Sequence, residues 1–210
     1  MTCKSLTFPL AILLTVALAA CGGDTTEPAS STVDTTRQAD PAGNPQDAYW
    51  ANLEARCGQA FEGSVTDGND SDSAFAGETL VMHVRECGAD ELKIPFHVGE
   101  DRSRTWVLSR TGAGLRLKHD HRLDDGSEDE VTQYGGDTID EGSTTRQDFY
   151  ADTFTAELLP AAATNIWAME IEPGNYFAYS LRREEEGRYF RVEFDLTTPV
   201  EAPPAPWGHE

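Results

Sequence analysis

The chain has 210 residues and a formal net charge of −21 at pH 7, because 37 acidic residues face only 16 lysines and arginines. A surface this acidic repels nucleic acid and anionic lipid headgroups, since phosphate binding needs Lys and Arg to displace counterions. The composition therefore excludes a nucleic-acid-binding protein. It leaves binding of cations, binding of basic partners, or plain solubility as the reason for the charge. The length suits one domain with its own core.

Residues 1–20 have the layout of a secretion signal. Lys4 supplies a positive charge, residues 6–19 form an apolar run, and small residues precede Cys21. The run is shorter than the ~20 residues that a membrane-spanning helix needs. The segment Leu18-Ala19-Ala20-Cys21 resembles the lipobox of bacterial lipoproteins. The resemblance implies cleavage before Cys21, acylation of that cysteine, and attachment to a membrane of the bacterial cell envelope through the acyl chains.

Composition divides the rest of the chain. Gly22 follows the lipidated cysteine, where an aspartate would indicate retention in the inner membrane of enteric bacteria, so we expect the outer membrane, facing the periplasm or the surface. Residues 21–46, rich in Thr, Ser, Asp, Pro and Gly, predict a disordered tether. Residues 199–210 predict a Pro-rich C-terminal tail. The folded domain is then expected at residues 47–198.

Two cysteines are left for the folded domain. Cys3 leaves with the signal and Cys21 takes the lipid, so Cys57 and Cys87 remain. An even pair in an oxidising compartment predicts a disulfide. A redox-active pair would have a C-x-x-C spacing, which is absent.

The apolar residues follow a helical period first and a period of two afterwards. Asp47 is expected to cap a short helix that ends at Gly58. Alternation of apolar and polar residues predicts strands at 61–66, 80–84, 92–98, 105–110, 115–121, 131–134, 144–149, 166–171, 176–183 and 188–197. Residues 154–163 are a second helix candidate, with Pro160 inside it.

Short strands joined by tight turns predict a mainly β fold. An antiparallel up-and-down β-barrel of about eight to ten strands, with the short N-terminal helix, removes the exposed sheet edges. A β-sandwich is the alternative. The layout resembles the calycin architecture of lipocalins and fatty-acid-binding proteins in topology, which implies a barrel that holds a small ligand.

Two further motifs carry a second resemblance. Trp50…Cys57-Gly58…Phe61-Glu62-Gly63 and residues 117–122 with Asp125-Gly126 are similar to a family of secreted proteobacterial proteins. That family has no known activity, so the resemblance implies no function.

Two groups of residues suggest metal binding. His119 and His121 share one strand face with Leu117, which would place both imidazoles at one mouth of the barrel, where a transition metal could bind. The alternative is that they hydrogen-bond the adjacent acidic turn. Asp67, Asn69 and Glu78 offer the oxygen ligands that calcium prefers. The alternative there is solvated acidic surface.

The sequence predicts a binding protein more than an enzyme, since it contains no G-x-S-x-G, H-E-x-x-H, P-loop or G-x-G-x-x-G motif. We expect a small apolar or amphipathic ligand inside the barrel and no resident cofactor. The pocket is expected to be lined by Trp106, Leu117, His119, His121 and Trp167, with Arg182 as a polar anchor. Two alternatives stay open: a structural or interaction lipoprotein with a filled barrel that recognises a basic partner, and a divalent-metal-binding envelope protein.

Overall fold

The computed structural model describes residues 43–68, 75 and 77–210, which belong to one compact unit. The predicted signal peptide, the predicted lipidation site Cys21, most of the predicted tether and Asn69 lie outside the described residues. No helix in the described ranges is long and apolar enough to cross a membrane.

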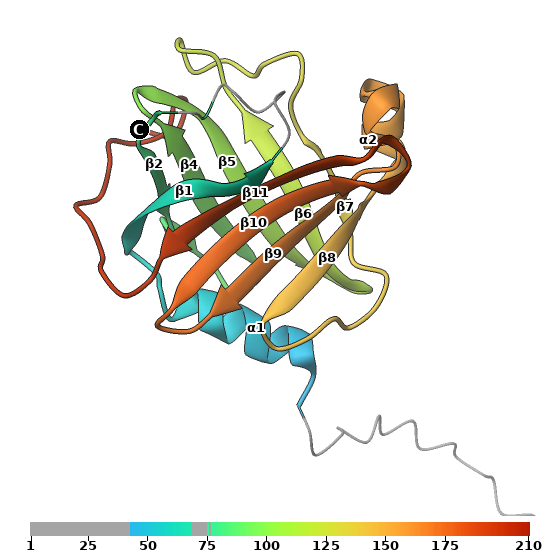
Figure 1. Cartoon of the computed structure of the whole chain (residues 1–210), viewed down its shortest axis with the longest axis horizontal. Helices are drawn as coiled ribbons and strands as arrows, with labels where there is room; N and C mark the ends of the chain where they lie inside the picture. The colour runs from blue at the N-terminus through green and yellow to red at the C-terminus, as the bar shows by residue number, and fades with distance from the viewer. Residues whose placement is uncertain (1–42, 69–74, 76) are drawn as a thin grey trace, which may run out of the picture. The chain divides into compact units, whose positions relative to one another are not determined.

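One antiparallel sheet contains all eleven strands of the described residues (Figure 1). Their bounds are β1 Ala60–Gly68, β2 Leu80–His83, β3 Glu86–Cys87, β4 Glu91–Val98, β5 Asp101–Thr111, β6 Gly114–His121, β7 Tyr134–Asp137, β8 Arg146–Ala151, β9 Ile166–Glu172, β10 Tyr176–Arg183 and β11 Arg188–Asp195. Neighbouring strands pair from β4 to β11. β11 then pairs with β1, β1 with β2, and β2 with β4, so ten strands close into a barrel and β3 adds a short extra pairing to β4. The predicted up-and-down antiparallel barrel is confirmed.

Strand alternation separates the core from the surface. On β11, Phe190, Val192 and Phe194 are buried inside the barrel, whereas Arg191 and Glu193 lie on the outer face and pair with each other at 3.2 Å. Successive side chains of a strand point to opposite faces, so a period of two in the sequence becomes an apolar interior.

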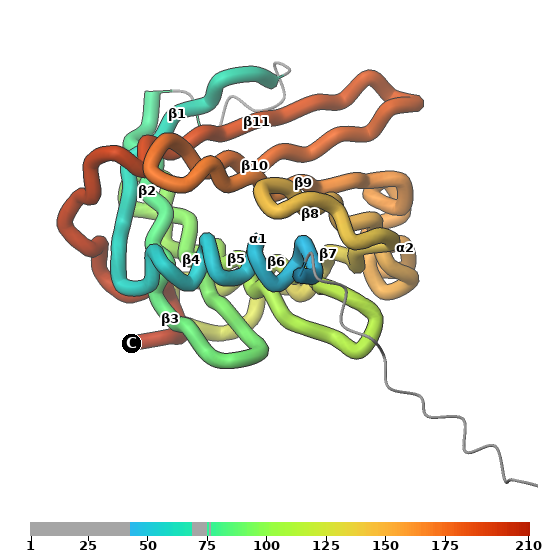
Figure 2. The backbone as a smooth tube through the Cα atoms, turned by 90° about the horizontal axis from the view of Figure 1, so that it is seen from below, coloured from blue at the N-terminus to red at the C-terminus, as the bar shows by residue number. Residues whose placement is uncertain are grey.

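Helix α1 (Pro45–Glu54) crosses one end of the barrel (Figure 2) and buries Tyr49, Trp50 and Leu53 there. Its cap is Asn44, whose side chain accepts a hydrogen bond from the Gln46 N–H. The prediction that Asp47 caps the helix was wrong, because Pro45 fits the first helical position and the cap lies three residues earlier.

Cys57 and Cys87 form the predicted disulfide, with their Cα atoms 6.2 Å apart. The bond joins the turn that follows α1 to strand β3. It closes a loop of 30 residues and thereby restricts the unfolded chain.

Most elements match their predictions to within a few residues at each end, and α1 ends at Glu54, before the expected Gly58; β7 and the second helix differ for reasons that their residues explain. Strand β7 begins at Tyr134, three residues later than expected, and contains Gly135 and Gly136, where a Cβ atom would overlap backbone oxygens of the neighbouring strands. Helix α2 (Thr153–Leu158) ends before Pro160, which starts a separate 3₁₀ turn, η2 (Pro160–Ala162). Proline lacks the N–H that would continue the α-helix.

The C-terminal residues are part of the folded body, and the expectation that it ends at residue 198 needs correction. Arg85 and Arg102 donate hydrogen bonds to the carbonyl oxygens of His209 and Ala205, at 2.7 and 3.0 Å. The His209 ring lies 2.8 Å from the Asp120 carboxylate. Proline lacks an N–H, so this Pro-rich segment forms no strand beyond an isolated bridge of Val200 to Ala60, but its carbonyl groups accept hydrogen bonds from side chains of the barrel.

Candidate functional site

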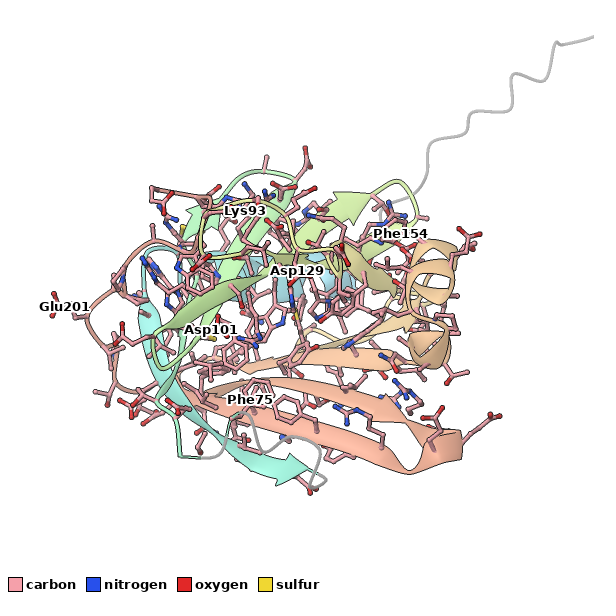
Figure 3. The ribbon with its side chains drawn as sticks, turned by 90° about the horizontal axis from the view of Figure 1, so that it is seen from above. Phe75, Lys93, Asp101, Asp129, Phe154 and Glu201 are labelled. Atoms are coloured by element: carbon pink, nitrogen blue, oxygen red, sulfur yellow. A yellow bond between two sulfur atoms is a disulfide. The ribbon has the colours of Figure 1, made fainter. Side chains whose placement is uncertain are left out.

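The barrel is packed at the end covered by α1 and hollow at the other end. Strand β6 runs from the packed end to the hollow end. Its N-terminal Gly114 lies beside Gln46 of α1, and Leu117 is fully buried in packed core. His119 and His121, further along the strand, border a cavity of about 450 Å³. Figure 3 views the barrel from the hollow end, where Phe75 and Asp129 lie near the middle of the picture and Phe154 of α2 lies to one side.

Aromatic rings form the wall of this cavity. Trp106 is stacked between Phe96 and Tyr179, with ring centroids 4.9 and 4.6 Å away. The buried aromatic residues that border the cavity are Phe96, Trp106, Trp167, Tyr179 and Phe190. Such a wall offers large apolar area with few polar atoms, as small-molecule sites do.

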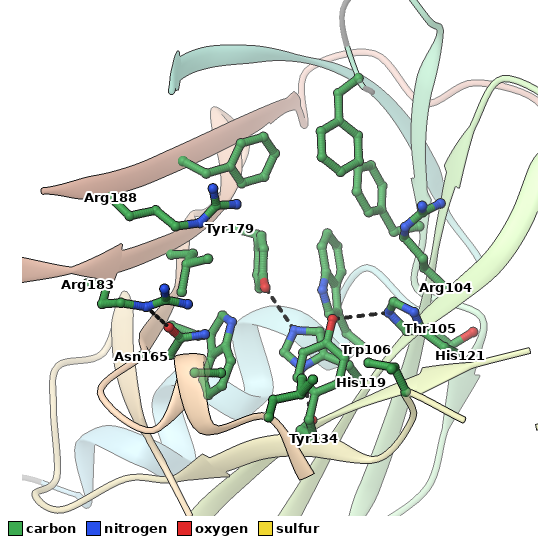
Figure 4. A pocket seen from close by; sticks show the side chains of 18 residues that line it. Arg104, Thr105, Trp106, His119, His121, Tyr134, Asn165, Tyr179, Arg183 and Arg188 are labelled. Carbon is green, nitrogen blue, oxygen red and sulfur yellow. Dashed lines mark hydrogen bonds between the residues drawn. The ribbon is translucent and has the colours of Figure 1, made fainter. Parts of the chain in front are cut away.

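His119 is a buried polar residue of the wall, together with Thr105 and Asn165 (Figure 4). Its Nδ1 lies 3.1 Å from the Tyr134 carbonyl oxygen and its Nε2 lies 2.8 Å from the Tyr179 hydroxyl. A carbonyl oxygen only accepts, so Nδ1 carries the proton and Nε2 accepts from the hydroxyl. Burial lowers the pKa of His119 to about 3, so the ring is neutral near pH 7.

His121 lies closer to the mouth, with Nε2 3.3 Å from the Tyr134 hydroxyl. Burial, followed by the nearby Arg104 guanidinium, lowers its pKa to about 4. The two histidines therefore lie at one mouth of the barrel, as the sequence predicted. Both rings also contact Tyr134.

The described residues contain no group of three or more His, Cys, Asp or Glu side chains that could hold a metal ion. Both ring nitrogens of His119 already have partners. Asp67 lies opposite Arg191 in the β1–β11 register, whereas the Glu78 carboxylate lies against Gly99. The two predicted calcium ligands therefore have different neighbours. We therefore do not propose a metal site from these residues.

Three arginines border the mouth of the cavity: Arg104 from β5, Arg183 from β10 and Arg188 from β11 (Figure 4). Arg183 donates to the Asn165 side chain at 2.8 Å and to Glu186 at 2.6 Å, and Arg104 donates to Asp101 at 2.5 Å. Among the described residues that line the cavity, none is Asp or Glu. The acidic side chains therefore stay outside the described lining, where Asp101 pairs with Arg104 and Glu186 pairs with Arg183.

Four of the six predicted pocket residues lie on the cavity wall: Trp106, Trp167, His119 and His121. Leu117 does not line the cavity, because it lies one inward position closer to α1, in the packed part. The prediction that Arg182 is a polar anchor of the pocket was also wrong. It lies on the outer face, 2.7 Å from Asp148.

The arginines of the mouth were missed by the sequence analysis, although one signal could have found Arg183. Tyr179, Leu181 and Arg183 share a strand face by simple alternation, which excludes Arg182 from that face. The same alternation places Arg188 on the face of Phe190 and Val192. It places Arg104 on the face of Trp106 and Leu108, because β5 begins at Asp101, earlier than the predicted strand at 105–110.

No known protein family, curated protein or solved structure matches this chain. The resemblances to lipobox lipoproteins, to calycins and to the secreted proteobacterial family therefore remain predictions from the sequence.

Proposed function

We propose that this chain is a non-enzymatic lipoprotein of the bacterial envelope, anchored at Cys21, whose barrel binds a small apolar or amphipathic ligand. The observation that carries the proposal is the cavity of about 450 Å³ bordered by Trp106, Trp167 and Tyr179. Small-molecule sites span roughly 300–1,000 Å³ and combine apolar walls with a few placed polar groups. A barrel that is filled throughout, as in the alternative of a purely structural protein, would leave no such space.

The envelope location rests on two features of the chain. The segment 18–21 with its preceding apolar run supports lipidation at Cys21. The disulfide between Cys57 and Cys87 fits an oxidising compartment, since such bonds are rare in the cytosol.

Native mass spectrometry tests the binding proposal. Residues 39–210, which contain the whole compact unit, are secreted to a bacterial periplasm and purified without detergent or chelator. We expect an added mass of a few hundred daltons that organic extraction removes. A bare polypeptide mass contradicts a tightly held ligand, and an added mass of one or two metal ions would favour the metal-binding alternative instead.

A pair of variants separates the wall of the cavity from the packed core. Trp106→Ala and Leu117→Ala each remove buried apolar volume from neighbouring strands, and each is expected to cost about 3 kcal/mol of stability. Only Trp106→Ala is expected to lose the retained ligand. Equal retention in both variants would contradict the assignment of Trp106 to the binding wall.

A further inference from the structure

Residues 122–133, the mouth loop, connect β6 to β7 at the hollow end of the barrel, where Figure 3 shows Asp129 near the middle. Val131 of this loop borders the cavity, although 39% of the residue is exposed to solvent. Asp129 donates its N–H to the carbonyl oxygen of His121, which also borders the cavity, at 3.0 Å. The position of the mouth loop therefore affects how widely the cavity opens.

The mouth loop returns to the sheet through a strained residue. Among the described residues, Gln133 is the single non-glycine residue with a positive φ, 59°. A side chain makes this backbone conformation unfavourable, so the surrounding contacts have to hold it. The Gln133 N–H donates to the His119 carbonyl oxygen at 2.7 Å, and its side-chain amide donates to the Asp120 carboxylate at 3.1 Å. The loop thus depends on Asp120 at this end.

Asp120 joins the mouth loop to the C-terminal residues. Its buried carboxylate accepts hydrogen bonds from both ends of the loop, from Arg122 Nε at 2.9 Å and from the Gln133 side chain. The other carboxylate oxygen lies 2.8 Å from Nε2 of His209. A buried carboxylate needs partners for its oxygens. Loss of His209 therefore disturbs the group that holds both ends of the loop.

Two glycines bring the backbones of the mouth loop and the C-terminal residues into direct contact. A Cβ atom at Gly208 would lie 2.6 Å from the Gly126 carbonyl oxygen. A Cβ atom at Gly126 would lie 3.1 Å from the Gly208 Cα. The neighbouring Trp207 donates its N–H to the Arg102 carbonyl oxygen of β5 at 3.2 Å. The C-terminal residues thereby hold the middle of the loop against the barrel.

We propose that residues 205–210 are a latch that holds the mouth loop over the cavity, and that a ligand enters and leaves when the latch releases. The latch forms no strand, and Arg85 and Arg102 bind its carbonyl oxygens. A chain end held by individual hydrogen bonds opens at a lower free energy than the barrel unfolds. The inference rests on the proposed ligand-binding function and specifies how its site is gated.

Three variants of residues 39–210 test the latch. His209→Ala removes the ring from Asp120, and Gly208→Ala pushes a Cβ against Gly126. Gly174→Ala is the matched control, because Gly174 has nearly the same φ as Gly208 (77° against 76°) but has no atom within 4 Å of an added Cβ. The control therefore reproduces the backbone strain without touching the mouth loop.

Stopped-flow fluorescence measures the gate with N-phenyl-1-naphthylamine, an uncharged apolar probe. We expect His209→Ala and Gly208→Ala to speed both association and dissociation about 10-fold, the effect of losing one hydrogen bond to a charged group. The Kd is expected to stay within about 2-fold, because a gate changes how often the site opens and not the contacts of the bound probe. Gly174→Ala should keep the wild-type rates.

Amide hydrogen exchange measures the loop without any ligand. The Asp129 N–H, bonded to the His121 carbonyl oxygen, reports whether the mouth loop is closed. We expect it to exchange about 10-fold faster in both latch variants and at the wild-type rate in Gly174→Ala.

The outcomes separate the two proposals. Unchanged probe rates and unchanged Asp129 exchange in His209→Ala and Gly208→Ala overturn the latch and leave ligand binding standing. Equal acceleration in Gly174→Ala also overturns it, because the effect would then follow general destabilisation. A weaker Kd with an unchanged association rate contradicts gating and assigns the loop to the binding wall. Failure of the wild type to bind the probe counts against the proposed function, and hydrogen exchange then still decides whether the latch holds the loop.

Discussion

The buried imidazole of His119 makes the stability of the barrel depend on pH. In the folded protein its pKa is lowered from 6.5 to about 3, because burial removes water from the charged form. In the unfolded chain the ring titrates at its ordinary pKa. Between pH 6.5 and 3 the unfolded state therefore binds the proton and the folded state does not. Stability is fully present above pH 6.5 and decreases as the pH falls.

The size of this effect follows from the two pKa values. A pH of 5.0 is about 1.5 units below the pKa of the ring in the unfolded chain. Each of these units corresponds to about 1.36 kcal/mol of unfolding free energy. His119 alone therefore lowers the free energy of unfolding by about 2 kcal/mol between pH 7.5 and pH 5.0. The folded ring stays neutral over this range, so the figure depends little on how far below 5 its pKa lies.

The assay is urea denaturation of the wild type and of His119→Gln at both pH values. The variant loses stability at each pH, because glutamine cannot reproduce both hydrogen bonds to Tyr134 and Tyr179. Its loss between pH 7.5 and 5.0 is expected to be about 2 kcal/mol smaller than that of the wild type. Leu117→Ala, on the same strand, is the control that is destabilised yet keeps the full pH dependence. Equal pH dependence in the wild type and His119→Gln would refute the assignment of a buried neutral ring.

Three further predictions concern stability. Gly136→Ala places a Cβ against the Tyr150 carbonyl oxygen and is expected to lower the free energy of unfolding by about 3 kcal/mol in urea denaturation. The control Gly112→Ala has open space around it and should lower it little. Equal losses in the two variants would contradict the close approach of the strands. Replacing both Cys57 and Cys87 with serine should lower the free energy of unfolding by about 3.5 kcal/mol, and the wild type in reductant should match that variant. Deletion of residues 199–210 removes three side-chain hydrogen bonds of about 1 kcal/mol each and should lower the Tm by roughly 6–12 °C; an unchanged Tm would indicate a free tail.

The sequence predicted the fold because short alternating strands joined by tight turns have few ways to bury one face without leaving edges. It also predicted which residues of β6 face inward, since Leu117, His119 and His121 alternate with charged neighbours. Alternation gives the side of a strand but not the depth along the barrel. For that reason Leu117 was expected in the pocket and lies in the packed core instead.

The site could be predicted only in part. Trp106 and Trp167 were expected on the wall because aromatic residues on barrel strands point inward, and both lie there. The meeting of the arginines at one mouth depends on strand register and on closure of the barrel. Arg183 and Arg188 meet because the β10–β11 hairpin aligns them, and Arg104 joins them because the closed barrel brings β5 to the same opening.

The sequence by itself determined the alternation of apolar and polar residues, the disulfide pair, the acidic charge and the turns, all of which are local or compositional properties. Only the tertiary structure decided how full the barrel is, because the volume left inside depends on the summed packing of side chains from ten strands and on the helix that covers one end. It also brought three arginines, separated by up to 84 positions, to one opening, because the closure of the barrel places the ends of β5, β10 and β11 side by side.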